Sequence, residues 1–292
     1  MRLLVVDAFT DRPFSGNPAG VCLLPGPADP GWMQLVAAEM RHAETAFVRR
    51  LADLADPADP DDPGADYELR WFTPAVEVRL CGHATLAAAH ALFETGEADP
   101  ARPLRFRTLH SGVLTARPGS AGMLEMEFPA TPPRPIEEPP GLAAALGVPV
   151  TWTGRSDQDD VLAVVADEDA VRALTPDLDA LVGLDARGVC VTAPATGDPD
   201  FVSRFFAPRV GVPEDPVTGS THCMLGPYWA GRLGRTALTG HQASPRGGRV
   251  HVTVTGDRAV LAGHAVTVLD GALRDAAVSI TETDDRSTGG AP

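Results

Sequence analysis

The sequence contains no lysine: all 24 basic residues among its 292 are arginine. This absence excludes a Schiff-base lysine, a lysine that anchors pyridoxal phosphate and the lysine of a Walker A phosphate-binding loop. The 39 acidic residues outnumber the arginines and give a formal net charge of −15. We therefore expect neither a nucleic-acid partner nor binding to an anionic membrane surface.

Cysteine is also scarce, and the four cysteines form no C-x-x-C pair: Cys22, Cys81, Cys190 and Cys223. No apolar run approaches the length needed to cross a membrane. The amino-terminal segment is expected to be a short apolar strand that ends at an acid rather than a signal peptide. These features predict a cytoplasmic protein whose reduced cysteines are either buried small side chains or reactive thiols.

Several catalytic motifs are missing. The eight histidines include no H-E-x-x-H motif, and no cysteine or histidine pair has zinc-finger spacing, so we expect no metal. No G-x-S-x-G nucleophile elbow is present. A glycine-rich strand-to-helix turn for nicotinamide or flavin is absent too, so we expect no cofactor.

The segment 72–92 (FTPAVEVRLCGHATLAAAHAL) is the one around which the sequence is organised. Its first part alternates as a strand would, and its second part predicts a helix that is apolar nearly all round and therefore buried. The first turn of such a helix has unpaired N–H groups, and Gly82 lets a ligand approach them closely, which suits a carboxylate. The alternative is an ordinary core helix with a glycine–histidine entry turn.

A second copy of this unit lies at 206–230. The tripeptide at 72–74 (FTP) is echoed at 206–208 (FAP), and 81–85 (CGHAT) is echoed at 218–222 (TGSTH). A repeated strand–glycine–helix unit indicates a duplicated half-domain.

The duplication predicts that the helix starts at Gly82 and Gly219 face each other and hold one anion between two halves. Pro227, eight residues past Gly219, is expected to kink or end the second helix early.

Strands outnumber helices in the rest of the chain and occur mainly in hairpins, which predicts an α+β fold with largely antiparallel sheets, each around one buried helix. Strands are expected at 3–8, 21–24, 104–109, 113–117, 123–128, 161–165, 188–192, 201–206, 249–255 and 260–269, and helices at 29–40, 141–146 and 170–174.

The predicted halves span 1–117, with a returning strand at about 264–280, and 118–263. We interpret the acidic Asp/Pro/Ala insert at 52–66 as a mobile loop without chemistry. The polar tail at 281–292 is expected to be disordered.

A set of acid–base groups remains once cofactors are excluded: Glu44, His83, Asp215 and Ser220, with Cys81 adjacent. Glu44 lies where a helical pattern changes to a strand, a position at which a glutamate is most often a cap or an edge charge. A carboxylic acid held in an apolar cavity has a raised pKa and can take and return a proton near neutral pH. Such a set favours proton transfer on a carbon acid or a conjugated ring.

Combined, five motifs resemble the PhzF-like phenazine-biosynthesis family, within the diaminopimelate-epimerase-like fold. They are residues 5–10 (VVDAFT), 14–19 (FSGNPA), 43–47 (AETAF), 81–85 (CGHAT) and 214–220 (EDPVTGS). The resemblance extends from Val5 to Val266. It implies two pseudo-symmetric halves, each a sheet curled around a central helix, with the active site in the cleft between them.

The resemblance also implies a role for individual residues. Glu44 would be the catalytic acid–base group, with His83 and Asp215 as its catalytic partners and Ser220 binding the substrate. The other residues expected to line the substrate are Gly82, Gly219, Cys81 and Thr218. The family generally forms homodimers, and its namesake isomerises a dihydro-hydroxyanthranilate by moving a proton around the ring. We therefore expect an isomerase that acts on a small carboxylate.

One departure from related epimerases bears on the mechanism. Those enzymes use one cysteine before each glycine as a pair of bases, whereas this chain has Cys81 before Gly82 but Thr218 before Gly219. Racemisation by two thiols is thus disfavoured. A one-sided epimerase or tautomerase using Cys81 stays open, since a thiol before a helix start is expected to have a lowered pKa. A non-catalytic protein that binds a metabolite or a partner stays open as well.

Overall fold

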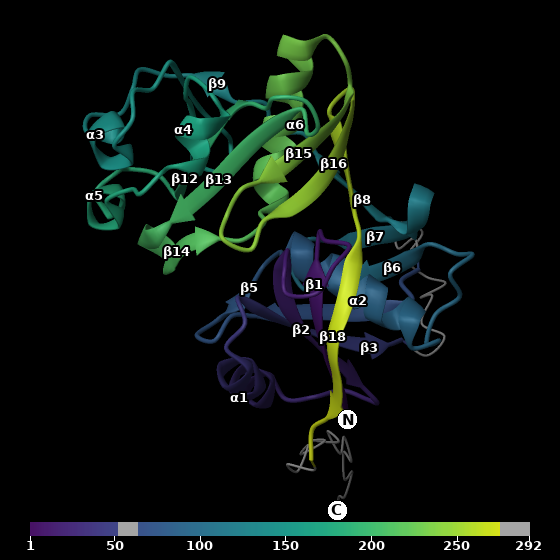
Figure 1. Ribbon diagram of the computed structural model, residues 1–292. Helices are drawn as coiled ribbons and strands as arrows, with labels where there is room; N and C mark the ends of the chain where they lie inside the picture. The colour runs from purple at the N-terminus through teal and green to yellow at the C-terminus, as the bar shows by residue number, and fades with distance from the viewer. Residues whose placement is uncertain (52–63, 275–292) are drawn as a thin grey trace, which may run out of the picture.

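The computed structural model describes residues 1–51 and 64–274, in which eighteen strands form one large, curled sheet (Figure 1). Within 1–51 and 64–274, strand β18 pairs only with β1 and strand β9 only with β10, so the sheet formed by these residues does not close on itself. The expected α+β class with largely antiparallel pairing is confirmed. Among the described residues, no helix combines the length and the apolar character needed to span a membrane.

The chain folds as two structural repeats, which lie in the lower and upper parts of Figure 1. The first repeat comprises β1 (Arg2–Ala8), β2 (Asn17–Leu24), α1 (Pro30–Met40), β3 (Glu44–Arg50), β4 (Tyr67–Phe72), β5 (Glu77–Val78), α2 (Gly82–Glu94), β6 (Leu104–Arg107), β7 (Val113–Pro118) and β8 (Leu124–Pro129). It is followed by β9 (Arg134–Pro135) and α3 (Leu142–Leu146).

The second repeat comprises β10 (Trp152–Arg155), β11 (Asp160–Val164), α4 (Glu168–Arg172), α5 (Leu178–Val182), β12 (Gly188–Pro194), β13 (Phe201–Ala207), β14 (Val212–Asp215), α6 (Gly219–Leu233), β15 (Ala237–Gln242), β16 (Gly248–Thr255) and β17 (Arg258–Gly263). The last strand, β18 (Ala265–Ala272), returns to pair with β1 of the first repeat.

The strand pairing of the two repeats is the same. The pair β1–β2 is antiparallel, β2–β3 parallel and β3–β4 antiparallel, and the pairs β10–β11, β11–β12 and β12–β13 follow in the same order. A parallel pair then encloses the central helix: β4 with β6 around α2, and β13 with β15 around α6. Strands β8 and β17 join the two repeats into one sheet. The two pseudo-symmetric halves are thereby confirmed, whereas their exact residue boundaries stay a prediction.

A charged cluster recurs at the same place in both repeats. In each, an arginine forms two hydrogen bonds with a glutamate while its guanidinium lies over a phenylalanine ring. The clusters are Arg70–Glu77–Phe72 in the first repeat and Arg204–Glu214–Phe206 in the second. This match fixes which positions of β3–β4 and β12–β13 are equivalent.

Helix α2 is enclosed by its sheet, as its composition predicts. Nine of its 13 residues are buried, and most are alanine, whose small side chain lets the strands approach the helix closely. Helix α6 is buried likewise in the second repeat, where it packs on Phe201, Phe205 and Leu238. Each repeat therefore holds one helix inside its curl, and the first turn of each helix points toward the other repeat.

The expectation that Pro227 could end the second central helix early is wrong, because α6 continues through it to Leu233. A proline has no N–H to donate to the carbonyl four residues earlier, which here belongs to Cys223. That carbonyl instead accepts a hydrogen bond of 2.9 Å from the N–H of Thr131, outside the helix. A tertiary contact thus satisfies the group that proline would leave unpaired.

The other differences from expectation concern strand limits. Strand β2 begins at Asn17, four residues before the strand expected at 21–24. The strand expected to start at Phe72 instead ends there, and the strand expected at 260–269 is broken at His264. Strands β10, β14 and β15 and helix α5 are short and were not expected. The glycine at position 240 of β15 weakens the sequence pattern from which a strand is predicted. Glycine fits there because a Cβ atom would lie 2.5 Å from the Phe201 ring.

Two predicted segments fall partly or wholly beyond the structure. Residues 52–63 of the acidic insert and the tail at 281–292 lie outside the described residues. Asp66, at the carboxyl end of the insert, accepts hydrogen bonds from the backbone and side chain of Arg105.

Candidate active site

The two central helices start opposite each other, where the repeats meet. A Cβ atom added to Gly82 would lie 3.9 Å from Cα of Gly219, and the reverse distance is also 3.9 Å. Neither residue has a side chain, so the two backbones approach closely. The first-turn N–H groups of α2 and α6 therefore meet in one region.

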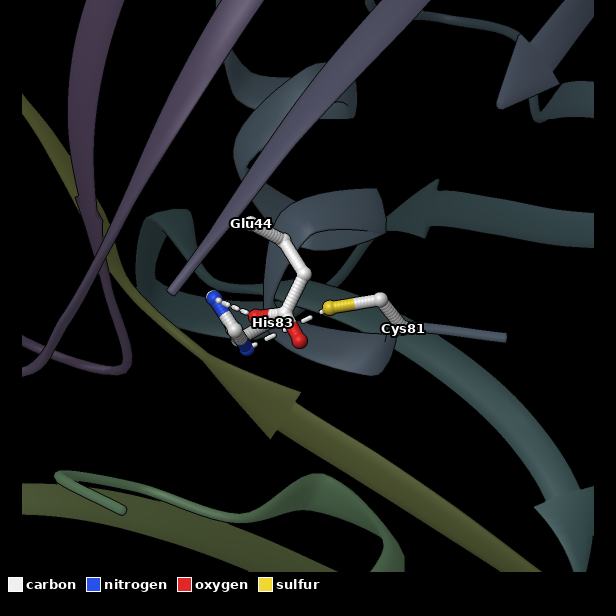
Figure 2. A group of neighbouring side chains, drawn as sticks. All are labelled: Glu44, Cys81 and His83. Carbon is white, nitrogen blue, oxygen red and sulfur yellow. Dashed lines mark hydrogen bonds and ion pairs between the residues drawn. The ribbon is translucent and has the colours of Figure 1, made fainter. Parts of the chain in front are cut away.

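Glu44, His83 and Cys81 gather at the start of α2. Figure 2 shows the Glu44 carboxylate and the Cys81 thiol next to the His83 ring, each joined by a dashed line to a different ring nitrogen. Glu44 Oε2 lies 3.4 Å from His83 Nε2, and Cys81 Sγ lies 3.4 Å from His83 Nδ1. The junction between α1 and β3 thus turns the Glu44 side chain inward rather than into solvent.

Burial sets the protonation of these groups. Removal from water raises the pKa of Glu44 to about 7, with the nearby charge of Asp215 acting in the same direction. Burial lowers the pKa of His83 to about 3, so the imidazole is neutral at physiological pH. A carboxyl group that titrates near neutrality beside a neutral histidine is suited to accept and return a proton.

The tautomer of His83 follows from its neighbours. Nδ1 faces the Cys81 thiol at 3.4 Å, which can donate a hydrogen, whereas both hydrogens of the Asn17 amide, 3.3 Å away, are donated to Asp215 and to the Val217 carbonyl. Nδ1 is then the acceptor, and the proton resides on Nε2. Among the described residues, Nε2 has no aligned hydrogen-bond partner although it is buried, which leaves an N–H available to a ligand.

Asp215 lies at the end of β14 and is held by donors from both repeats. The Asn17 amide donates to Oδ1 at 2.7 Å, and the Thr218 hydroxyl donates to Oδ2 at 2.6 Å. Burial raises the pKa of Asp215 to about 6, while these two hydrogen bonds act to lower it. Because both oxygens already accept hydrogen bonds, Asp215 is a weaker candidate base than Glu44.

Gln242 orders the start of α6. Its amide nitrogen donates to the Asp215 carbonyl at 2.7 Å and to the Thr218 hydroxyl at 3.1 Å, and its oxygen accepts from the Thr218 N–H at 2.9 Å. Gln242 is fully buried. Thr218 is thus fixed as a hydrogen-bonding residue, without a base that would turn its hydroxyl into a proton acceptor.

The loop that delivers Asn17 is fixed by a buried ion pair. Asp7, which is 1% exposed, accepts hydrogen bonds from the Phe14 N–H and from Arg246, each at 2.7 Å. Arg246, from the second repeat, also donates to the Gly16 carbonyl at 2.8 Å. These contacts hold Asn17 beside His83 and Asp215.

The pKa of the Cys81 thiol is raised rather than lowered as expected. The position before a helix start predicts a lowered pKa, but burial raises the pKa of this thiol well above its usual value, and the nearby charge of Glu44 adds to the shift. The side chain is 7% exposed. The desolvation of the thiolate outweighs the helix dipole here, so Cys81 is a neutral thiol beside Glu44.

Ser220, in the first turn of α6, lies apart from the groups around Glu44. Its hydroxyl oxygen is 3.4 Å from Arg187 Nη2. Arg187 forms two further hydrogen bonds with Asp160, at 2.9 and 2.5 Å. The second helix start therefore has a cation close by, whereas the first has an acid.

Glu44, Cys81 and His83 are also the described residues that could supply ligands to one metal ion, since a donor atom of each lies within 4.8 Å of the others. However, Glu44 faces Nε2 and Cys81 faces Nδ1 of the same ring. A metal ion would also need Cys81 as a thiolate, and burial raises the pKa of this thiol. The arrangement fits proton transfer better than metal binding, and the absence of a metal stays a prediction.

Sequence reasoning missed three residues of this region: Asn17, Gln242 and Arg187. Asn17 belongs to a motif that carries the family resemblance, and that membership was the available signal. Gln242 and Arg187 lie in segments without a motif, and only the fold brings them to the site.

The sequence of the chain is similar to that of a known protein family. Residues 6–271 match the family model described as phenazine biosynthesis-like protein. An uncharacterised isomerase of Halalkalibacterium halodurans is 44% identical over 269 residues, which cover 91% of this chain and 96% of that protein.

Solved structures agree as well. A PhzF-family protein of Enterococcus faecalis has a TM-score of 0.84 and 38% identity, covering 92% of this chain and 97% of that one. A probable proline racemase of Agrobacterium radiobacter shares the fold alone, with a TM-score of 0.58 and 14% identity over 94% of this chain and 92% of that one.

Proposed function

The chain belongs to the phenazine biosynthesis-like family, and from this membership and the geometry of the site we propose that it is a cofactor-independent isomerase. It moves a proton within a small, carboxylate-bearing molecule by general acid–base catalysis. The observation that carries the proposal is the largely buried Glu44 carboxyl group, whose side chain is 20% exposed and whose pKa is raised to about 7, beside the neutral imidazole of His83.

In this mechanism Glu44 removes a proton from one carbon of the substrate and returns it to another. The raised pKa makes the carboxylate a stronger base than an exposed glutamate and its acid form a usable donor near neutral pH. Removing the proton leaves negative charge that spreads onto a conjugated or carbonyl oxygen. The Nε2–H of His83 lies 3.4 Å from Glu44 Oε2 but makes no aligned hydrogen bond among the described residues, and it would donate to that oxygen of the substrate.

Asp215 supports the reaction through its charge. It is held as an acceptor by Asn17 and Thr218, and its proximity raises the pKa of Glu44. The two acids are coupled, so they titrate as a pair. Their environments differ, which assigns proton transfer to Glu44 and orientation of the substrate to Asp215.

The alternatives have less support. A one-sided epimerase would need Cys81 as a thiolate, and burial opposes that form. A non-catalytic metabolite-binding protein would not need a carboxyl group with a pKa near 7. Binding alone therefore does not explain the raised pKa of Glu44.

We also propose the setting in which the enzyme acts. It would function in the cytoplasm as a homodimer, without nucleic-acid or membrane partners and without a metal or cofactor. The four free and buried cysteines and the net charge of −15 support this setting.

The test of the proposal is exchange of carbon-bound hydrogen in D₂O. The purified protein is incubated with a panel of small carboxylates, and deuterium incorporation is followed by NMR. The proposal expects protein-dependent exchange at one carbon of at least one carboxylate. Exchange in none of a broad panel, with saturable binding of some of its members, would favour the binding-protein alternative.

A further inference from the structure

The site has a different charge at the start of α2 than at the start of α6. Equivalent positions of the two repeats show which residues cause this difference. In β3–β4, Thr45 pairs with Phe72. In β12–β13, Val189 pairs with Phe206. Phe72 and Phe206 are equivalent members of the repeated arginine clusters, so Thr45 corresponds to Val189.

Glu44, one residue before Thr45, therefore corresponds to Gly188. By the same duplication, His83 after Gly82 corresponds to Ser220 after Gly219. Where the first repeat has an acid, the second has a glycine, and the residue just before that glycine is Arg187.

The contacts at the two ends follow this correspondence. Glu44 lies 3.4 Å from His83 at the start of α2. Arg187 lies 3.4 Å from Ser220 at the start of α6. One helix start thus has a titrating acid close by and the other has a permanent cation, because a guanidinium stays charged at all relevant pH values.

The guanidinium of Arg187 is held by two neighbours, Asp160 and the Phe205 ring. Nε and Nη2 donate to Asp160, which is 1% exposed, and the group lies over the Phe205 ring at 5.4 Å. Gly188 allows this packing, because a Cβ atom there would lie 2.4 Å from the Phe205 ring. The arginine is therefore held in one orientation before any ligand arrives.

Part of the guanidinium stays available. Its hydrogen bonds to other described residues use Nε and Nη2, so Nη1 is open. The side chain remains 36% exposed whereas that of Asp160 is 2% exposed. A planar anion could contact Nη1, the Ser220 hydroxyl and the first-turn N–H groups of α6 together.

We propose that Arg187, together with Ser220, binds the carboxylate of the substrate and sets its orientation, with the anionic group at the start of α6 and the reacting carbon at Glu44. This inference rests on the proposed isomerase function and adds a specificity-determining residue to it. It names the substrate class more narrowly as a carboxylate whose exchangeable C–H is separated from the carboxylate group, because Arg187 lies at the start of α6 and Glu44 at the start of α2.

The test uses benzoate and benzamide as probes, which have nearly the same shape but differ in charge. Arg187→Met alone would leave Asp160 buried and unpaired, so the double variant D160N/R187M is used. The matched control is E77Q/R70M, which removes a similar two-bond pair whose arginine also lies over a phenylalanine ring, at 5.3 Å. Affinities are measured by calorimetry on the full chain.

The expected result is that D160N/R187M weakens benzoate binding by roughly ten- to a hundredfold, as loss of a hydrogen bond to a charged group does. The control should bind benzoate within about twofold of wild type, because the Arg70–Glu77 pair is not part of the proposed anion site. Equal benzoate affinity in wild type and D160N/R187M, or no saturable benzoate binding by wild type, would overturn the proposal. So would an equal loss in the control.

A second measurement does not depend on the variants folding. In the wild type, benzoate but not benzamide should shift the guanidinium NMR signal of Arg187, and absence of that shift would also overturn the proposal. Neither experiment requires turnover. If no carboxylate exchanged deuterium while benzoate still depended on Arg187, the isomerase function would fail and the anion site would stand.

Discussion

Asn17 and Asp215 are 198 positions apart in the sequence, and the amide of the first donates a 2.7 Å hydrogen bond to the carboxylate of the second. The same amide donates to the Val217 carbonyl at 2.8 Å. A single buried side chain of β2 therefore links the first repeat to the segment that leads into α6.

This link predicts the effect of Asn17→Ala. The change leaves the Val217 carbonyl and one Asp215 oxygen without their donor in a buried place, which typically costs about 1 to 3 kcal/mol. Urea denaturation should show a loss of that order in the free energy of unfolding. Thr218→Val removes the other side-chain donor to Asp215 but spares the link between repeats, so its loss should be smaller. An Asn17→Ala protein as stable as the wild type would contradict this assignment.

Glu44→Gln should change the dependence of stability on pH. The pKa of Glu44 is raised to about 7 in the folded protein, above its unfolded value, so its favourable contribution is complete below the unfolded pKa and is lost as pH rises through 7. Glutamine has no such loss. The variant should therefore gain stability relative to wild type between pH 5 and pH 8, on the order of 1 to 3 kcal/mol.

Urea denaturation at the two pH values measures this gain. The control is Glu39→Gln on α1, where the side chain is exposed and no comparable pH-dependent gain is expected. A Glu44→Gln difference that stays constant from pH 5 to pH 8 would show that Glu44 is not desolvated in the folded protein.

Cys81→Ser should leave most of the activity. Burial raises the pKa of the thiol, so the residue acts as a neutral neighbour of His83 rather than as a base, and a hydroxyl can replace its weak hydrogen bond. The measurement compares turnover of the variant and of wild type, with and without iodoacetamide. Rapid inactivation of the wild type by iodoacetamide, prevented by the serine, would support the one-sided epimerase instead.

Pro227→Ala should alter stability by less than about 1 kcal/mol, although a proline inside a helix usually costs about 3 kcal/mol. The reason is that the Cys223 carbonyl already accepts the Thr131 N–H. Gly226→Ala is the contrasting variant, because its Cβ atom would lie 2.5 Å from the Val252 side chain, and it should destabilise. A gain near 3 kcal/mol for Pro227→Ala would mean that the Thr131 contact does not compensate.

The fold was predictable where the sequence pattern is local or repeated. The apolar helix after Gly82 and its echo after Gly219 indicated the duplication and the buried helices. Pro227 shows the limit of such reasoning, because the propensity of one residue cannot reveal a partner from a distant loop. The strand that contains Gly240 was not predicted for a similar reason, because the need for glycine at this position depends on the distant Phe201 ring.

The residues of the site also fall into those that the sequence could predict and those that it could not. Glu44 and His83 could be selected because each lies at a recognisable change of pattern and within a motif. Asn17, Gln242 and Arg187 act through contacts between distant segments, which no spacing rule encodes. The raised pKa of Cys81 also required the structure, because the helix start and burial shift a thiol in opposite directions.

The most direct test of the central claim is deuterium exchange by Glu44→Gln on the carboxylate that the wild type exchanges fastest. We expect that Glu44→Gln retains the fold and the benzoate affinity while its exchange rate falls by about a hundred- to ten-thousandfold, as loss of a general acid–base group does. An exchange rate equal to that of wild type would contradict the assignment of Glu44 as the group that moves the proton.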